Sequence, residues 1–387
     1  MRPTYALRAS SPRPVASLGL PRIHAVLVAL LATVGVLAGD GQNALLGLPP
    51  IAVPADNPST PAKIALGKKL FMDRRLSPNN TLSCAMCHVP EQGFTQNELA
   101  TSVGFEGKSL RRNAPTLLNV ALHDSFQRDG AKPSLEAQVW GPLLAANEMA
   151  NGTVESVVSR LKTLPDYRGL FKVAFDGRGP DEETIGQALA SYERILLAGD
   201  SRFDRWYFGR DAQALSVEEQ AGFAVFKRAN CSTCHTVDEH TAPFTDNRFH
   251  NTGIHGARQQ LASRPISVQL APGVSVMVDP KDLANVSEPD QKDEGRFEVT
   301  GDPADQHAFK TPSLRNVALT PPYMHDGSIA TLAKVVDFYA GGAGCSLGEK
   351  VELPSQDRQQ LLAFLRSLTG ANAADLGREA RAAFVNY

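Results

Sequence analysis

The sequence contains the pattern Cys-x-x-Cys-His twice, at residues 84–88 and 231–235. Two thiols at this spacing can bond the vinyl groups of a c-type haem, and the histidine that follows can reach the haem iron. A zinc site built from the four cysteines is the alternative, but the long separation of the two pairs and the histidine after each pair disfavour it. The sequence therefore predicts two covalently bound haem c groups, attached at Cys84, Cys87, Cys231 and Cys234, with His88 and His235 as iron ligands.

Helical periodicity surrounds both motifs. Apolar residues recur at helical spacing in residues 62–71, 153–161, 181–197, 216–226, 332–339 and 355–368, whereas alternating strand patterns are scarce. Ser216 and Glu219 form a capping-box pattern at the start of one of these helices. With 387 residues, 42% of them hydrophobic, the chain can form two domains. We expect a mainly α fold of two cytochrome c-like helical domains, residues 39–205 and 206–387, each carrying one haem c.

The first 38 residues have the composition of an export signal. Four arginines and no acids precede an apolar run over residues 25–38. A retained membrane anchor is the alternative, although the run is shorter than the ~20 residues that span a bilayer. We therefore predict a periplasmic protein whose signal peptide, residues 1–38, is removed, with no stable membrane insertion afterwards.

The net charge, the fifth cysteine and one stretch without periodicity lead to three further expectations. The formal net charge is −2 and no basic run is interleaved with aromatic residues, so a nucleic-acid partner is not expected. Cys345, the one cysteine outside the two motifs, lies in a glycine-rich stretch and is interpreted as an incidental thiol. Residues 255–294 show little periodicity and predict a long surface excursion with room for a short hairpin.

Further stretches resemble the bacterial di-haem cytochrome c peroxidase and MauG superfamily, over nearly the whole chain after the signal. These are Leu-Gly-Lys-Lys-Leu-Phe (66–71), Arg-Asn-Ala-Pro-Thr (112–116), Ser-Leu-Glu-Ala-Gln (134–138), Asn-Glu-Met (147–149), Phe-Lys-Thr-Pro-Ser-Leu-Arg-Asn (309–316) and Pro-Tyr-Met-His-Asp-Gly (322–327). The resemblance implies a peroxide-reactive haem in the N-terminal domain and an electron-transfer haem in the C-terminal domain.

Two positions resemble the MauG branch rather than the peroxidases. In the peroxidases a histidine in the loop after the first haem motif blocks the reactive haem, and here Phe105 stands at that position. The peroxidases also place a methionine on the second haem, fourteen residues after the histidine of the His-Asp-Gly motif; counted from His325, that residue is Tyr339. The resemblance thus implies an open first iron and a phenolate ligand, Tyr339, that lowers the potential of the second haem. Packing roles for both aromatic residues are the alternatives.

The resemblance also assigns residues above the first haem. Glu148 and Gln138 match the distal positions of the family, and Pro142 would form a wall of the pocket. Splitting peroxide requires a base that moves a proton between the two oxygens and a polar group that stabilises the developing charge. We expect Glu148 and Gln138 to be the catalytic residues, with the pKa of Glu148 raised by an apolar pocket. A surface acid is the ordinary alternative for Glu148.

Two further family features lie between the haems. A calcium ion is held there by an asparagine side chain and backbone carbonyl groups, and the matching positions are Asn113, Thr320 and Pro322; oxygen ligands of this kind suit calcium. The family also has a tryptophan between the haems, and the corresponding segment here reads Phe126-Gln-Arg-Asp-Gly, which puts Arg128 at the tryptophan position. Trp140 is a conceivable substitute, although packing is its commoner role.

Three functions remain open at this point. Phe105 and Tyr339 favour an enzyme that uses hydrogen peroxide to oxidise tryptophan or tyrosine residues of a partner protein by long-range electron transfer. One alternative is a peroxidase that reduces hydrogen peroxide with electrons from a small cytochrome or cupredoxin. The other is a non-catalytic di-haem electron carrier, which would have two six-coordinate haems. The protein substrate and its oxidised product, a cross-linked quinone or kynurenine, lie outside the sequence.

Overall fold

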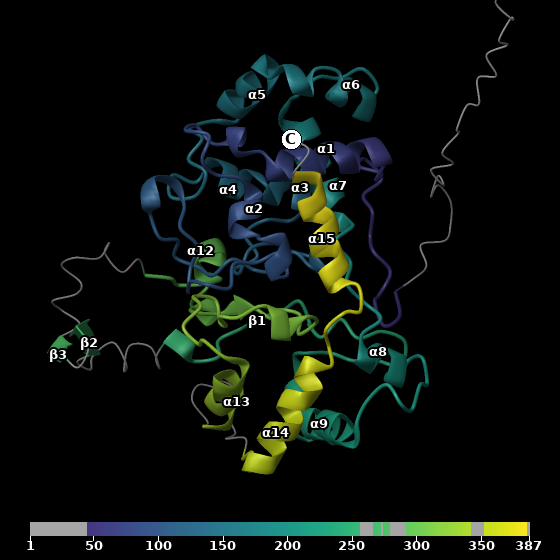
Figure 1. The fold of residues 1–387 in the computed structure, drawn as a ribbon, viewed down its shortest axis with the longest axis vertical. Coiled ribbons are helices and arrows are strands. Elements are labelled where there is room, and N and C mark those ends of the chain that lie inside the picture. Colours follow the sequence, from purple (N-terminus) through teal and green to yellow (C-terminus); the bar gives the residue numbers. More distant parts are fainter. Residues whose placement is uncertain (1–44, 256–265, 272–273, 279–291, 342–351, 385–387) are drawn as a thin grey trace, which may run out of the picture. The chain divides into compact units, whose positions relative to one another are not determined.

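The computed structural model describes residues 45–255, 266–271, 274–278, 292–341 and 352–384. In this part of the chain the structure is mainly helical (Figure 1). Its α-helices are α1 Pro61–Met72, α2 Cys84–Cys87, α3 Leu135–Gln138, α4 Trp140–Leu144, α5 Val154–Thr163, α6 Leu170–Ala174, α7 Glu182–Arg194, α8 Arg202–Tyr207, α9 Val217–Arg228, α12 Phe297–Thr300, α13 Leu332–Ala340, α14 Ser355–Arg366 and α15 Ala373–Phe384.

Short 3-10 helices and small strands connect these helices. The 3-10 helices are η1 Arg74–Leu76, η2 Pro90–Gln92, η3 Phe105–Gly107, η4 Val120–Leu122, η5 Pro165–Tyr167, η6 Cys231–Thr233, η7 Pro303–Asp305 and η8 Val317–Leu319. Strand β1 (Phe249–His250) pairs antiparallel with β4 (Phe309–Lys310), and β2 (Ile266–Ala271) pairs antiparallel with β3 (Val274–Val278). The second pair is the short hairpin expected within residues 255–294.

The six helices predicted from periodicity are all present, and their ends have local causes. The predicted capping box of α9 is confirmed, because Ser216 accepts from the Glu219 N–H and the Glu219 side chain accepts from the Ser216 N–H. Helix α7 ends at Arg194 rather than at residue 197. Instead, the Leu196 carbonyl accepts from the Asn119 N–H, and the Ala198 N–H donates to the side-chain oxygen of Asn119.

The described residues contain two main hydrophobic cores. The first is built largely from α1, α5 and α7, and the second from α8, α9, α13 and α14. Helix α15 lies beside the first group in Figure 1, and its Ala380 belongs to the first core. A Cβ atom on Gly377 of α15 would lie 2.7 Å from the Pro90 carbonyl oxygen. The C-terminal helix therefore packs on the N-terminal core, which the assignment of residues 206–387 to one domain does not anticipate.

A glycine crossing joins the principal helix pair of each core. In the first, a Cβ atom on Gly67 of α1 would lie 1.9 Å from the Ala188 carbonyl oxygen of α7. In the second, a Cβ atom on Gly222 of α9 would lie 1.9 Å from the Gln360 carbonyl oxygen of α14. Only glycine allows backbones to approach this closely, so both helices that precede a haem motif are fixed by the same kind of contact.

The two halves also share an internal repeat. The tetrapeptide Asn-Val-Ala-Leu occurs at residues 119–122 and 316–319, and both asparagines adopt a left-handed φ of 62° before a 3-10 helix. The Asn119 N–H donates to Leu196, and the Asn316 N–H donates to Leu368. The stretches that follow end in Arg-Asp-Gly and His-Asp-Gly. Arg128 and His325 therefore hold equivalent positions in the repeat.

The predicted export signal (residues 1–38) and Cys345 lie outside the described residues. Within the described part, every helix is too short or too polar to cross a membrane.

Candidate haem sites

The first haem motif is presented by a short helix at the edge of the N-terminal core. Cys84 and Cys87 are the two ends of α2, and His88 follows directly. The Nδ1 atom of His88 lies 3.2 Å from the Phe94 carbonyl oxygen, and burial lowers the pKa of His88. A neutral ring that donates from Nδ1 leaves the Nε2 lone pair for an iron atom. The local structure thus suits His88 as a haem ligand.

A cavity of 590 Å³ lies over this motif. Its walls include the motif residues Cys84, Cys87 and His88. They also include Gln138, Pro142 and Glu148, which the family resemblance placed above the first haem. Burial raises the pKa of the Glu148 carboxyl, which is the direction expected for an acid that exchanges a proton near neutral pH. Among the described residues, His88 is the only histidine that lines this cavity. The cavity therefore combines one iron ligand with a protonatable acid and an amide.

Phe105 lies in the loop where the family resemblance places the blocking histidine. Its N–H donates to the Glu148 carbonyl oxygen at 2.9 Å, and its partly buried ring packs against the first core. A Cβ atom on the preceding Gly104 would lie 1.9 Å from the Asn147 carbonyl oxygen. The loop therefore packs directly against the segment that carries Glu148. Phe105 thus has a packing role, and its side chain also offers no atom that could bind the haem iron.

Sequence reasoning did not identify Glu193, a buried acid of α7 that also lines the cavity. Burial and the neighbouring charge of Glu136 raise the pKa of Glu193 to about 8. The position could have been noticed, because Glu193 falls seven residues after Gly186 and four after Leu189, on an otherwise apolar stripe of the helix.

Two polar atoms at the cavity test whether a haem fits there. The Oε2 atom of Glu193 and the Nε atom of Arg128 are both buried, and neither has a hydrogen-bond partner within the described residues. Both residues line the cavity. Buried polar atoms without partners are uncommon in folded proteins, and a bound group with polar substituents would account for them. Together with the two thiols and His88, they fit a covalently bound haem.

The second haem motif repeats the first arrangement. Cys231 begins η6, Cys234 follows it, and the Nδ1 atom of His235 lies 2.9 Å from the Phe244 carbonyl oxygen. Burial lowers the pKa of His235, as it does for His88. Phe94 and Phe244, the two acceptors, both adopt positive φ angles of 55° and 53°. The same local frame therefore presents both histidines.

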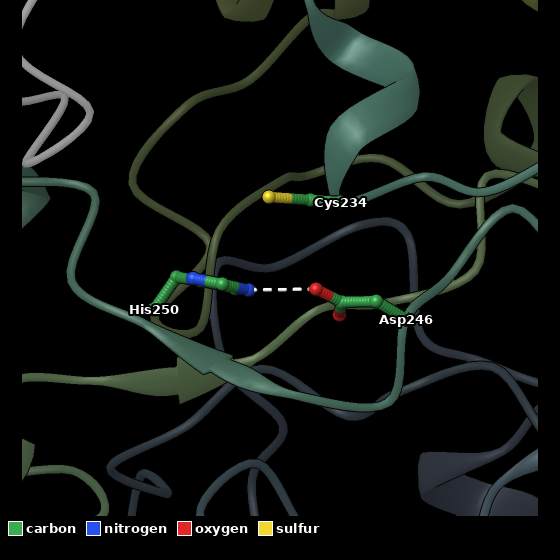
Figure 2. A group of neighbouring side chains, drawn as sticks. All are labelled: Cys234, Asp246 and His250. Atoms are coloured by element: carbon green, nitrogen blue, oxygen red, sulfur yellow. Dashed lines mark hydrogen bonds and ion pairs between the residues drawn. The ribbon is translucent and has the colours of Figure 1, made fainter.

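Figure 2 shows two further residues at the second motif, Asp246 and His250, which the sequence reasoning did not identify. The His250 Nε2 atom lies 2.8 Å from Asp246 Oδ2, and the ligand atoms of both lie within 4.8 Å of the Cys234 sulfur. This donor set could bind a metal ion if Cys234 were a free thiolate. Because Cys234 belongs to the haem-attachment motif, we interpret the Asp246–His250 pair as flanking the attachment point of the second haem.

Tyr339 lies in the last turn of α13 and is half-buried. Its ring packs edge-on against Phe338, with 5.2 Å between ring centroids. Ligation of the second haem by Tyr339 stays a prediction.

Two of the three residues expected at a calcium ion, Asn113 and Thr320, have identifiable protein partners. The Asn113 N–H donates to the carbonyl of His325, three residues beyond Pro322, at 2.8 Å. The Asn113 side-chain amide donates to Ala100, and its oxygen accepts from Arg128 at 3.1 Å. The Thr320 hydroxyl donates to the Val317 carbonyl oxygen. The structure thus brings Asn113 to the segment after Pro322, but it gives the expected metal-binding oxygen of Asn113 to Arg128.

Comparison with known proteins agrees with these haem sites. A family model described as di-haem cytochrome c peroxidase matches residues 61–212. The methylamine utilization protein MauG of Methylorubrum extorquens is 37% identical over 333 residues, which cover 83% of this chain and 82% of the relative. The cytochrome-c peroxidase IdrP1 of Denitromonas iodatirespirans is 36% identical over 359 residues, or 90% and 92% of the two chains.

A solved structure extends the similarity to the fold. The crystal structure of a MauG-like protein associated with microbial copper homeostasis is 33% identical, with a TM-score of 0.69 over 87% of this chain and 97% of that protein. Identity above 30% over most of both partners shows a shared family. The chain therefore belongs to the di-haem cytochrome c peroxidase and MauG family, and it is an oxidoreductase of that family with two haem c groups implied.

Proposed function

We propose that this protein uses hydrogen peroxide to oxidise tryptophan or tyrosine residues of a partner protein by long-range electron transfer. The observation that carries this proposal is Phe105. The family resemblance places the blocking histidine at this position, and the loop of Phe105 is fixed to the Glu148 segment by the hydrogen bond from the Phe105 N–H. A cavity that carries Glu148 and Gln138 and has His88 as its one described histidine suits a haem that is open to peroxide without prior reduction.

The side chains of the cavity define the chemistry that the chain itself contributes. A haem attached there supplies the redox chemistry that breaks the O–O bond of peroxide. Glu148, with its raised pKa, accepts a proton from one peroxide oxygen and returns it to the departing oxygen. Gln138 offers an amide that stabilises the charge developing on that oxygen. Pro142 closes one wall without adding a group that competes for the proton.

The other half of the proposal concerns the second haem and its surroundings. Tyr339, as a phenolate ligand of the second haem together with His235, would lower the potential of that haem and favour storage of oxidising equivalents. The domains 39–205 and 206–387 would each hold one haem. The export signal at residues 1–38 would place the enzyme in the periplasm, where it would bind its partner protein. One calcium ion between the haems also stays a prediction, and Arg128 competes with it for Asn113.

Spectra of the fully oxidised protein test the proposal. We expect one high-spin and one low-spin ferric signal by electron paramagnetic resonance, and a change in both the electron paramagnetic resonance and absorption spectra when peroxide is added without any reductant. Y339F should remove or shift the low-spin signal, whereas Y323F, a change at a half-buried tyrosine bonded to the Val317 carbonyl, should not. Two low-spin signals that ignore peroxide would contradict the proposal and indicate an electron carrier.

A peroxidase that takes electrons from a small cytochrome or cupredoxin is the second candidate, because the relatives include cytochrome-c peroxidases as well as MauG proteins. It predicts a different response in the same experiment. The oxidised protein would react with peroxide only after one haem had been reduced, and reduced cytochrome would then be consumed continuously. Oxidation of a partner protein, detected as a mass change on a tryptophan or tyrosine peptide, would instead support the first candidate.

A further inference from the structure

Arg128 lies at the centre of the contact between the two halves of the repeat. Its backbone carbonyl accepts from the Lys310 N–H at 2.8 Å, and the His325 carbonyl accepts from the Asn113 N–H at the same distance. Asn113 and Lys310 hold equivalent positions in the repeat, as do Arg128 and His325. The contact therefore includes two reciprocal hydrogen bonds, and one of the residues that form them, Arg128, carries a cationic side chain.

The Arg128 guanidinium uses the oxygen that a metal ion would need. Its Nη2 atom lies 3.1 Å from Asn113 Oδ1 and 3.4 Å from the Asn113 backbone oxygen. The Asn113 amide nitrogen is already committed to the Ala100 carbonyl, which fixes the direction of the side-chain oxygen. Calcium binds oxygens at about 2.3–2.6 Å, so an ion on Asn113 Oδ1 would lie within a few ångströms of the guanidinium, where like charges repel.

The surrounding charges also argue against a second cation. Arg112 binds Asp129 at 2.6 Å and Asp293 at 2.7 Å, so these two nearby carboxylates already have an arginine partner. Burial lowers the pKa of His123 to about 4, and the charges of Lys310 and Arg128 add to the lowering. Lys310 has a pKa lowered to about 8 and donates to the Ser125 carbonyl. Arg128 thus already shares its buried surroundings with two other cationic groups, Arg112 and Lys310, and with the carboxylate of Asp326.

We propose that Arg128 is the resident cation between the two haem sites, and that it takes the place of the calcium ion which the family resemblance predicts at Asn113. Arg128 stands at the position expected to hold a tryptophan, and Asn113 stands at the position of an expected metal ligand. In this chain the Arg128 guanidinium contacts the Asn113 amide oxygen. An internal guanidinium cannot be removed by chelators, so the contact between the halves would not depend on calcium.

Calcium content of the purified holoprotein is the direct test. Wild type is incubated with calcium, desalted and analysed by elemental mass spectrometry, and its melting temperature is measured with calcium and with EGTA. R128M removes the charge and releases the Asn113 oxygen. R296M is the matched control, because Arg296 donates to the neighbouring carbonyls of Asp129 and Gly130 and not to Asn113. R128K keeps a positive charge at the same position.

We expect wild type, R296M and R128K to retain less than about a tenth of the one ion that a calcium site would hold, with equal melting temperatures in calcium and EGTA. R128M should retain up to one ion and melt several degrees higher in calcium than in EGTA, because a ligand that binds only the folded state stabilises it. One calcium ion in wild type would overturn the proposal, and this holds even if R128M fails to fold. R128M without calcium, or equal uptake by R128M and R296M, would also overturn it.

Discussion

The buried acid Glu193 gives the protein a pH dependence that can be worked out from the structure. Its pKa is raised to about 8 from an ordinary value of 4.5, mainly by burial and next by the charge of Glu136. Between these two pH values the unfolded chain has released a proton that the folded chain still holds. The free energy of unfolding therefore falls as the pH rises from about 4.5 to about 8, and this contribution is fully present only below the lower value.

The size of the effect follows from the pKa difference. One pKa unit corresponds to about 1.4 kcal/mol, so raising the pH from 4.5 to 7 should cost roughly 3 kcal/mol of stability through this one group. E193Q is neutral at every pH and has nearly the same shape. It should be about 3 kcal/mol more stable than wild type at pH 7 and nearly equal to it at pH 4.5.

Guanidinium unfolding of the holoprotein at pH values from 4.5 to 8, followed by far-ultraviolet circular dichroism, measures both quantities. E182Q is the matched control, because Glu182 is an exposed residue at the start of the same helix, α7. Its stability should follow the wild-type profile. If E193Q also falls with pH as steeply as wild type does, Glu193 is ionised in the folded protein and the reasoning is wrong.

Three other substitutions test separate parts of the structure. E148Q should slow the reaction with peroxide by about 100- to 10,000-fold in stopped-flow measurements while leaving the ferric absorption spectrum unchanged, because it removes only the proton carrier. D204N should destabilise the fold by about 3–5 kcal/mol in denaturant titrations, since it leaves the fully buried Arg315 guanidinium without its two-point partner. G67A should lower the melting temperature by forcing α1 away from the Ala188 carbonyl oxygen, at a cost of about 1–3 kcal/mol.

Local chemistry explains why much of the haem sites could be predicted from the sequence. Two thiols and a histidine at fixed spacing define an attachment point without reference to the rest of the fold. Likewise, the capping pair Ser216 and Glu219 acts within one turn of helix, so its prediction needed no tertiary information. The grouping of Glu148, Gln138 and Pro142 around one cavity came from resemblance, which carries tertiary information indirectly.

The features that were missed depend on which segments meet in space. Glu193 has an ordinary position near the end of an amphipathic helix, and only the packing of α7 beside the cavity makes its carboxyl unusual. Helix α15 follows the second core in sequence but packs on the first, because Ala380 and Gly377 find partners there. The contact of Arg128 with Asn113 joins residues of two different loops, 15 positions apart in the sequence. Periodicity contains none of this information.

The internal repeat offers a reason why one chain can hold two haems with different expected roles. Both halves use a glycine crossing between two helices, a histidine bonded to a phenylalanine carbonyl, and an asparagine turn tied to the end of a later helix. Because the backbone frame is shared, differences between the two sites must come from side chains placed on equivalent positions. Arg128 and His325 are one such pair, and both lie where the halves meet. A change at residue 128 therefore alters the contact between the sites while leaving the frame of each site intact, which is the condition under which the two haems could diverge in function.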